Sequence, residues 1–142
     1  MDIAAALRDT RAMRSTLRIA VTLVGAGFVL QGLLWLAAPA RAAAGLGMPL
    51  LDGLGRSTQA GDLASFFLTA GVTIALGSRP GRARLLYVPA GLVGGAAVAR
   101  TLVWALHGAA FAGTFIAGEV VVTALLLAAV NAGRDEVQPP EA

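Results

Sequence analysis

Apolar residues in this chain form four long runs, separated by short segments rich in glycine, proline and arginine. The runs cover residues 17–38, 58–77, 85–106 and 111–131. The hydrocarbon core of a bilayer is about 30 Å thick, so about 20 apolar residues in helical form cross it. The pattern therefore predicts an all-α fold, a bundle of four transmembrane helices.

The overall composition agrees with a membrane protein. Hydrophobic residues make up 57% of the 142 residues and charged residues only 13%, against roughly 25% charged residues in soluble domains. A soluble domain of this size has a large surface, and the chain has too few polar side chains to cover it. We interpret the chain as one multi-pass domain whose first partner is membrane lipid.

The chemistry open to the chain is narrow. It has no cysteine and one histidine, His107, which excludes disulfides and thiolate sites and argues against a transition-metal or haem site. We therefore expect no metal and no cofactor. The net charge of +3 comes mostly from the ends of the apolar runs, and no pattern of basic and aromatic residues indicates nucleic-acid binding.

Arginine placement predicts the orientation. Eight arginines flank one side of the predicted bundle and two flank the other. The eight are Arg8, Arg11, Arg14, Arg18, Arg79, Arg82, Arg84 and Arg134, and the two are Arg41 and Arg56. Because arginine-rich flanks stay in the cytoplasm, both termini should be cytoplasmic. Residues 1–16 are then a basic cytoplasmic segment, residues 17–131 the membrane domain and residues 132–142 a disordered cytoplasmic tail.

The N-terminal region has further interpretations. Its arginines recur every three or four residues, which is typical of a short interfacial helix, although a merely charged flank explains them as well. Followed by an apolar run and "APARAAAG", it also resembles a signal peptide. The apolar run of residues 17–38 is longer than the usual 7–15 residues of a signal peptide, so we expect the first span to stay attached.

Polar residues lie at a similar depth in the predicted spans. Gln31, Arg100 and Glu119 each lie eight residues from the outer turn of their span, or roughly 12 Å at 1.5 Å per residue. Asp62 lies about one turn into the second span. Because an unpaired charge inside a membrane costs about 2.5–3.5 kcal/mol, Arg100 needs an acceptor. Glu119 is the first candidate and Asp62 the second.

Helical spacing extends this group of polar residues. Trp104 and His107 lie on the same helical face as Arg100, and we expect the polar faces of the spans to meet inside the bundle. The predicted cluster forms an outward-facing pocket and consists of Arg100, Glu119, Asp62, Gln31, His107 and Trp104.

Structural interpretations of the same residues stay open. The Arg100–Glu119 pair could bind a ligand or only fix the register of two helices. Asp62 could cap the second helix, and His107 could be solvated at a helix end. The segment between the first two spans could fold over the outer mouth as a short helix or lid, or lie along the surface as a loop. Small residues four apart, Gly91 with Gly95 and Gly113 with Ala117, favour close helix contacts.

The order Arg100, Gly108 after an apolar turn, and Glu119 opening the last apolar run resembles a bacterial family of small four-helix membrane proteins of unknown function, grouped loosely with the DoxX-like proteins. The resemblance covers residues 17–131 and implies the four-helix fold and the Arg–Glu pair. That family often has an acidic residue before the hairpin glycine and a proline soon after, where this chain has His107 and "GAAF". The resemblance implies no activity.

Three functional hypotheses follow. The first is a non-enzymatic protein of the bacterial plasma membrane that binds a small or amphiphilic ligand in the polar pocket, or uses the polar cluster to hold its fold. The second is an accessory or structural subunit of a homo-oligomer or larger membrane complex, with the glycine faces as the contact. The third is a membrane enzyme that uses Glu119 as a general acid or base.

The orientation is testable because the chain contains no natural cysteine. We expect a cysteine at Ser57 to react with a membrane-impermeant thiol reagent added outside cells, and a cysteine at Ala132 to stay protected. The reverse labelling pattern would show that the termini lie outside.

Overall fold

The computed structural model describes residues 3–134, and it describes side chains for residues 12–133. Residues 3–134 contain five α-helices and one 3₁₀ turn. The elements are α1 (Ile3–Ala37), α2 (Pro39–Gly45), α3 (Gly53–Gly77), η1 (Ala83–Leu86), α4 (Tyr87–His107) and α5 (Gly113–Arg134). Four helical segments are long and apolar enough to cross a membrane. The prediction of an all-α fold with four such helices is confirmed for these residues.

The helices extend beyond the predicted spans. α1 begins at Ile3, so the N-terminal segment is helical from that residue and continuous with the first span. α3 begins at Gly53, five residues before the predicted start, and α5 continues to Arg134. Hydropathy identifies only the apolar part of a helix. Polar helical turns beyond that part are not detected. The rest of the predicted tail, residues 135–142, lies outside the described residues.

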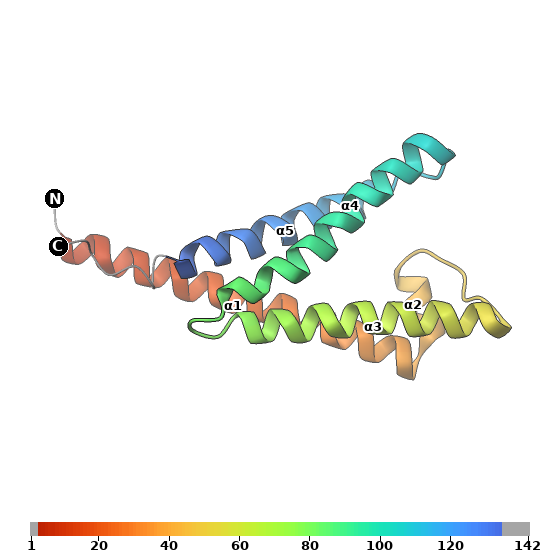
Figure 1. Cartoon of the computed structure of the whole chain (residues 1–142), viewed down its shortest axis with the longest axis horizontal. Helices are drawn as coiled ribbons and strands as arrows, with labels where there is room; N and C mark the ends of the chain where they lie inside the picture. Colours follow the sequence, from red (N-terminus) through yellow and green to blue (C-terminus); the bar gives the residue numbers. More distant parts are fainter. Residues whose placement is uncertain (1–2, 135–142) are drawn as a thin grey trace.

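The four long helices form two antiparallel pairs, α1 with α3 and α4 with α5 (Figure 1). The pairs meet near the α3–α4 connection and diverge toward the opposite end (Figure 1). We call the end with the α3–α4 connection the basic end, because Arg14, Arg18, Arg79, Arg82 and Arg84 lie there. The opposite end, with α2 and the α4–α5 turn, is the far end.

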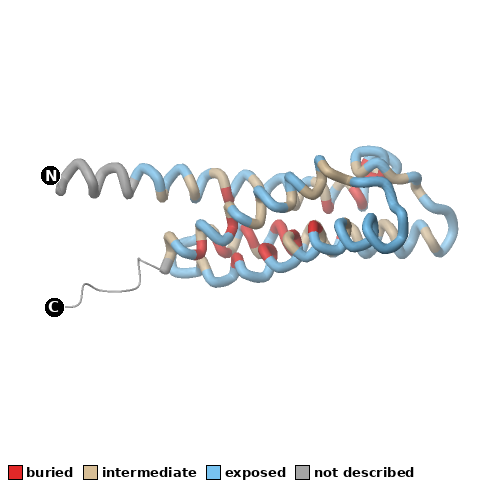
Figure 2. Tube along the Cα trace, turned by 90° about the horizontal axis from the view of Figure 1, so that it is seen from above, coloured by how far each residue is buried: buried red, intermediate tan, exposed pale blue. Residues whose placement is uncertain are grey.

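One core cluster joins all four long helices near the basic end. Val21 of α1, Ile74 of α3, Ala90 of α4 and Leu126 of α5 are buried together, with Leu86 and Val130. Elsewhere most residues lie on exposed outer faces (Figure 2). The two pairs are therefore held together mainly at one end.

A second core cluster lies at the far end and contains only α1, α2 and α3. Trp35 is fully buried between these helices, against Ala42 and Ala43 of α2 and Ala64 of α3. No residue of α4 or α5 belongs to this cluster. Of the two interpretations of the first loop, the structure therefore favours a short helix that packs on the α1–α3 pair.

Small residues set the distance between α1 and α3. A Cβ atom at Gly71 of α3 would lie 2.6 Å from the backbone nitrogen of Val29 and 2.9 Å from the carbonyl oxygen of Gly25, both in α1. Such close backbone approach is the use of small residues between membrane helices. Gly91 and Gly95, by contrast, meet nothing within 4 Å, so the prediction that they form a close helix contact in this chain is wrong.

We predict that Gly71→Ala destabilises the fold, because the added methyl group would collide with α1 backbone that cannot rotate away. Overpacking of this kind costs about 1–3 kcal/mol. Gly91→Ala is the matched control, because its methyl group enters open space and alanine is the better helix former. Thermal unfolding in detergent checks both, and an equal melting temperature for the two variants would contradict the close contact.

Candidate functional site

Arg100 of α4 and Glu119 of α5 form an ion pair within one helix pair. Arg100 Nε donates a hydrogen bond to Glu119 Oε1 over 2.8 Å. The Glu119 side chain is 16% exposed and that of Arg100 is 36% exposed. The short α4–α5 turn, which Gly108 enters at φ 64°, places the two residues level with each other. The predicted pairing is present in the structure.

Further contacts position the two charged groups. The Arg100 guanidinium lies 5.1 Å from the centre of the Phe115 ring, one helical turn before Glu119 on α5, which is within the range of a cation–π interaction. Glu119 Oε2 is buried and has no hydrogen-bond partner among the described residues. A buried carboxylate oxygen without a donor is rare in folded proteins and calls for an explanation.

A cavity of about 270 Å³ opens in front of this pair, between the two helix pairs. Every long helix contributes to its wall, and the wall is apolar apart from Arg100 and Glu119. The apolar side chains are Phe28 of α1, Leu46 and Met48 of the α2–α3 connection, Leu63, Phe66 and Phe67 of α3, and Val93 and Ala96 of α4. A largely apolar cavity with a few convergent polar groups is typical of a small-molecule site.

The loop side of the cavity is held by α3. The Gln59 amide donates to the Pro49 carbonyl over 3.1 Å, and its oxygen accepts from the Leu51 N–H over 3.0 Å. Arg56 donates to the Leu51 carbonyl and pairs with Asp52. These contacts fix the segment that carries Leu46 and Met48, so the cavity wall formed by the loop is anchored at α3.

Asp62 does not join the pair. It is exposed and makes no hydrogen bond or ion pair with the residues whose side chains are described. The expectation that it turns into the bundle is therefore wrong. Ala64 and Gly71 must face α1, and at 100° per residue Asp62 then lies roughly 160° from Ala64, on the opposite side of α3. Asp62 also lies well inside α3, so the capping interpretation fails as well.

The remaining predicted members are also separate from the cavity wall. Trp104 is 45% exposed and packs edge-on against Phe111, with 5.1 Å between the ring centres. His107 is exposed at the end of α4, where it ends the helix before Gly108. Gln31 is half-buried in α1 and does not line the cavity. Trp104 and His107 follow Arg100 along the same face of α4, toward the far end. The two helix pairs diverge toward that end (Figure 1), so this face continues past the cavity.

Sequence reasoning missed the apolar wall and the residue that anchors its loop. Phe28, Phe66 and Phe67 carry no pattern that separates them from other apolar residues in a span. Gln59 had a usable signal, because a glutamine near a helix start beside a proline-containing loop has several backbone partners within reach.

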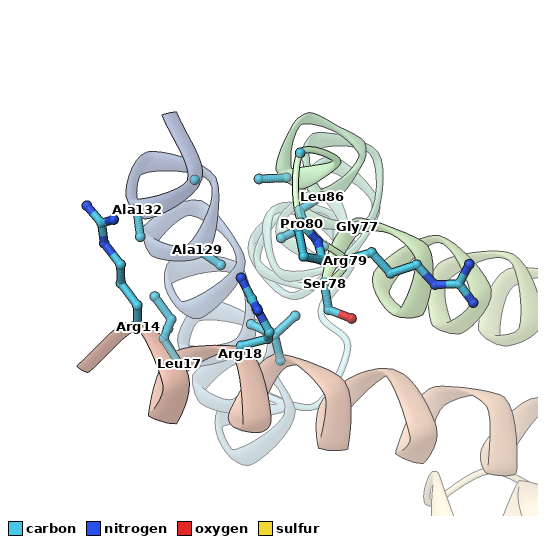
Figure 3. A pocket seen from close by; sticks show the side chains of 14 residues that line it. Arg14, Leu17, Arg18, Gly77, Ser78, Arg79, Pro80, Leu86, Ala129 and Ala132 are labelled. Atoms are coloured by element: carbon cyan, nitrogen blue, oxygen red, sulfur yellow. The ribbon is translucent and has the colours of Figure 1, made fainter. Parts of the chain in front are cut away.

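A smaller pocket of about 50 Å³ lies at the basic end, between α1, the end of α3 and α5. Arg14 and Arg18 point from α1 toward α5, whereas Arg79 points away from them (Figure 3). Among the residues whose side chains are described, the wall of this pocket contains arginines and no carboxylate, so it differs in chemistry from the cavity at Arg100 and Glu119.

No family model, no curated protein and no solved structure matches this chain. What the chain does must therefore be inferred from its own residues.

We predict that removing either charge of the pair destabilises the protein, because the remaining charged group then lacks its partner. Glu119→Leu strands a guanidinium that cannot lose its proton, whereas Arg100→Leu leaves a carboxyl group that can be neutralised by protonation. We expect Glu119→Leu to cost about 1–3 kcal/mol of stability and Arg100→Leu less, because Arg100 is partly exposed and breaking a fully buried pair costs roughly 3–5 kcal/mol.

The double variant Arg100→Leu/Glu119→Leu should recover much of the loss, since apolar residues can often replace a buried pair. Thermal unfolding of the four proteins in detergent measures the coupling. Thr114→Leu is the control, because Thr114 is an exposed residue of α5. Losses that simply add in the double variant would contradict the pairing.

Proposed function

We propose that this chain is a multi-pass protein of the bacterial plasma membrane that binds a small or amphiphilic ligand in the cavity between its two helix pairs. The single observation that carries the proposal is an apolar cavity of about 270 Å³ whose wall comes from all four long helices and includes Arg100 and Glu119. A purely structural ion pair explains Arg100 and Glu119, but it does not explain the apolar space in front of them. Membership of the small four-helix family related to the DoxX-like proteins is part of this proposal.

The size of the cavity supports a small ligand. An engineered protein cavity of roughly 150 Å³ holds a benzene molecule, so about 270 Å³ accommodates a larger apolar body. The wall comes from both helix pairs, and their only shared core cluster among the described residues lies toward the basic end. A ligand in the cavity would thus add contacts between the two helix pairs in the region where they share no core cluster.

Co-purification tests the proposal. The full-length protein is extracted in mild detergent from the membranes of the bacterium that produces it, and bound molecules are identified by native mass spectrometry and lipid extraction. Ala96 lines the cavity, and Ala99 is an exposed residue of the same helix. We expect a specific molecule on the native protein and on Ala99→Phe, and its loss from Ala96→Phe. Equal retention by both variants would contradict binding in the cavity.

A second candidate function is that of a subunit in a larger assembly, favoured by the exposed polar face of α3. Asp62, Ser65 and Thr69 lie on one side of a helix long and apolar enough to cross a membrane, and all three are exposed. A carboxylate facing lipid is costly, and a partner helix with a donor or a basic side chain opposite Asp62 would lower that cost.

Cross-linking in intact membranes tests this second function. A cysteine at Ser65 should give a larger cross-linked product that Asp62→Leu weakens, and a cysteine at Ala99 should give none. Absence of any product from Ser65→Cys would contradict a partner on this face.

A further inference from the structure

The ion pair offers a ligand only one of its two charged groups. Glu119 Oε1 accepts from Arg100 Nε, and Glu119 Oε2 is buried, so a molecule in the cavity does not reach a free carboxylate oxygen. Arg100 also lines the cavity, and its side chain is 36% exposed. Among the side chains of the wall, the polar group that a ligand can reach is therefore the guanidinium.

The guanidinium keeps hydrogen-bond donors for such a ligand. Arg100 uses Nε for Glu119, and among the described residues its two Nη atoms make no hydrogen bond. The buried polar side-chain atoms without a partner in this part of the chain are Trp35 Nε1 and Glu119 Oε2, so both Nη atoms remain accessible. Because arginine has N–H donors and no acceptor, the ligand must supply an acceptor.

The charge of the pair favours a neutral acceptor. Glu119 already balances Arg100, and the other side chains of the cavity wall are uncharged. An anionic head would therefore bring an unbalanced charge into an apolar cavity, which is costly.

The same geometry disfavours a hydroxyl head. A hydroxyl group brings a donor, but the carboxylate in the wall has one oxygen occupied by Arg100 and the other buried. A donor that stays unsatisfied lowers the free energy gained on binding. A carbonyl group accepts a hydrogen bond and brings neither a charge nor a donor.

We infer that the ligand is a neutral amphiphile with a carbonyl head, and that its carbonyl oxygen accepts a hydrogen bond from an Nη atom of Arg100. Its apolar chain contacts the aromatic wall formed by Phe28, Phe66 and Phe67. The carbonyl belongs either to a free ketone or ester, or to the acyl ester of a membrane lipid. This inference rests on the proposed function and names the chemical class of its ligand.

Competition binding in a bilayer without carbonyl groups tests this class. The full-length protein is placed in nanodiscs of ether-linked phosphatidylcholine, and the saturable retention of tritiated 2-decanone is measured against empty nanodiscs. The competitors are unlabelled 2-decanone, decane, which has no acceptor, 2-decanol, which has a hydroxyl group in place of the carbonyl, and decyl sulfate, which is permanently anionic. All are compared at the same concentration in the bilayer.

We expect 2-decanone to compete at least about tenfold better than decane, because decane leaves a charged donor without an acceptor. Both 2-decanol and decyl sulfate should compete several-fold more weakly than 2-decanone. Arg100→Leu/Glu119→Leu should erase the preference for ketone over alkane while the apolar chain still binds, and Thr114→Leu should keep it. Ala96→Phe should abolish retention, and Ala99→Phe should leave it unchanged.

A repeat in ester-linked phosphatidylcholine separates the two sources of the carbonyl. If the acyl ester of the lipid fills the cavity, retention of 2-decanone falls at least about tenfold, because the bilayer then supplies an excess of competitor. Unchanged retention assigns the site to a separate carbonyl compound. Both results support a carbonyl head.

Three results would overturn the inference. Equal competition by 2-decanone and decane would show that no acceptor is recognised. Competition by 2-decanol or decyl sulfate as strong as that by 2-decanone would show that the head is not a neutral carbonyl. No saturable retention of 2-decanone, or retention that survives Ala96→Phe, would show that a carbonyl amphiphile does not occupy the cavity. The proposed function is judged separately, because co-purification uses no added carbonyl probe.

Discussion

The hydrogen bond from Arg100 Nε to Glu119 Oε1 keeps both charges within one helix pair, and the form of the far end depends on it. Neither residue needs a counter-charge from α1 or α3, so the α4–α5 pair need not close onto them. Toward the far end the α1–α3 pair likewise packs without α4 and α5, because Trp35 and α2 form a core cluster there and Gly71 brings α3 close to α1. Two self-sufficient pairs that share a core cluster near one end can leave a cavity near the other.

The position of the pair explains why its second carboxylate oxygen matters. Oε1 turns to Arg100, whereas Oε2 is buried and without a donor beside an apolar wall. In a site of low dielectric an unsatisfied acceptor is costly, and the cost falls when a donor arrives. The same arrangement that makes the two charges tolerable thus leaves one carboxylate oxygen without a donor among the described residues. The aromatic side chains in front of the pair make the cavity suitable for an apolar molecule.

Much of the fold could be predicted from sequence because membrane helices are constrained by length and polarity. The depth of Arg100 and Glu119, counted from the turn between their helices, was enough to predict their contact. The direction of Asp62 was not predictable in the same way. Its depth is similar, but small residues that face α1 decide the rotation of α3, and the sequence does not reveal which glycines make close contacts. For the same reason the sequence predicted a close helix contact at Gly91 and Gly95, whereas the structure has one at Gly71. The aromatic wall of the cavity was not predicted either.

A density map of the full-length protein in lipid nanodiscs, at a resolution that separates side chains, tests the central claim most directly. We predict that Arg100 and Glu119 remain paired within the α4–α5 hairpin, that the two helix pairs stay apart at the far end, and that ligand density lies in the cavity between them. A map in which α4 and α5 close onto α1 and α3 along their whole length, with Phe66 and Phe67 packed directly over the ion pair, would contradict it.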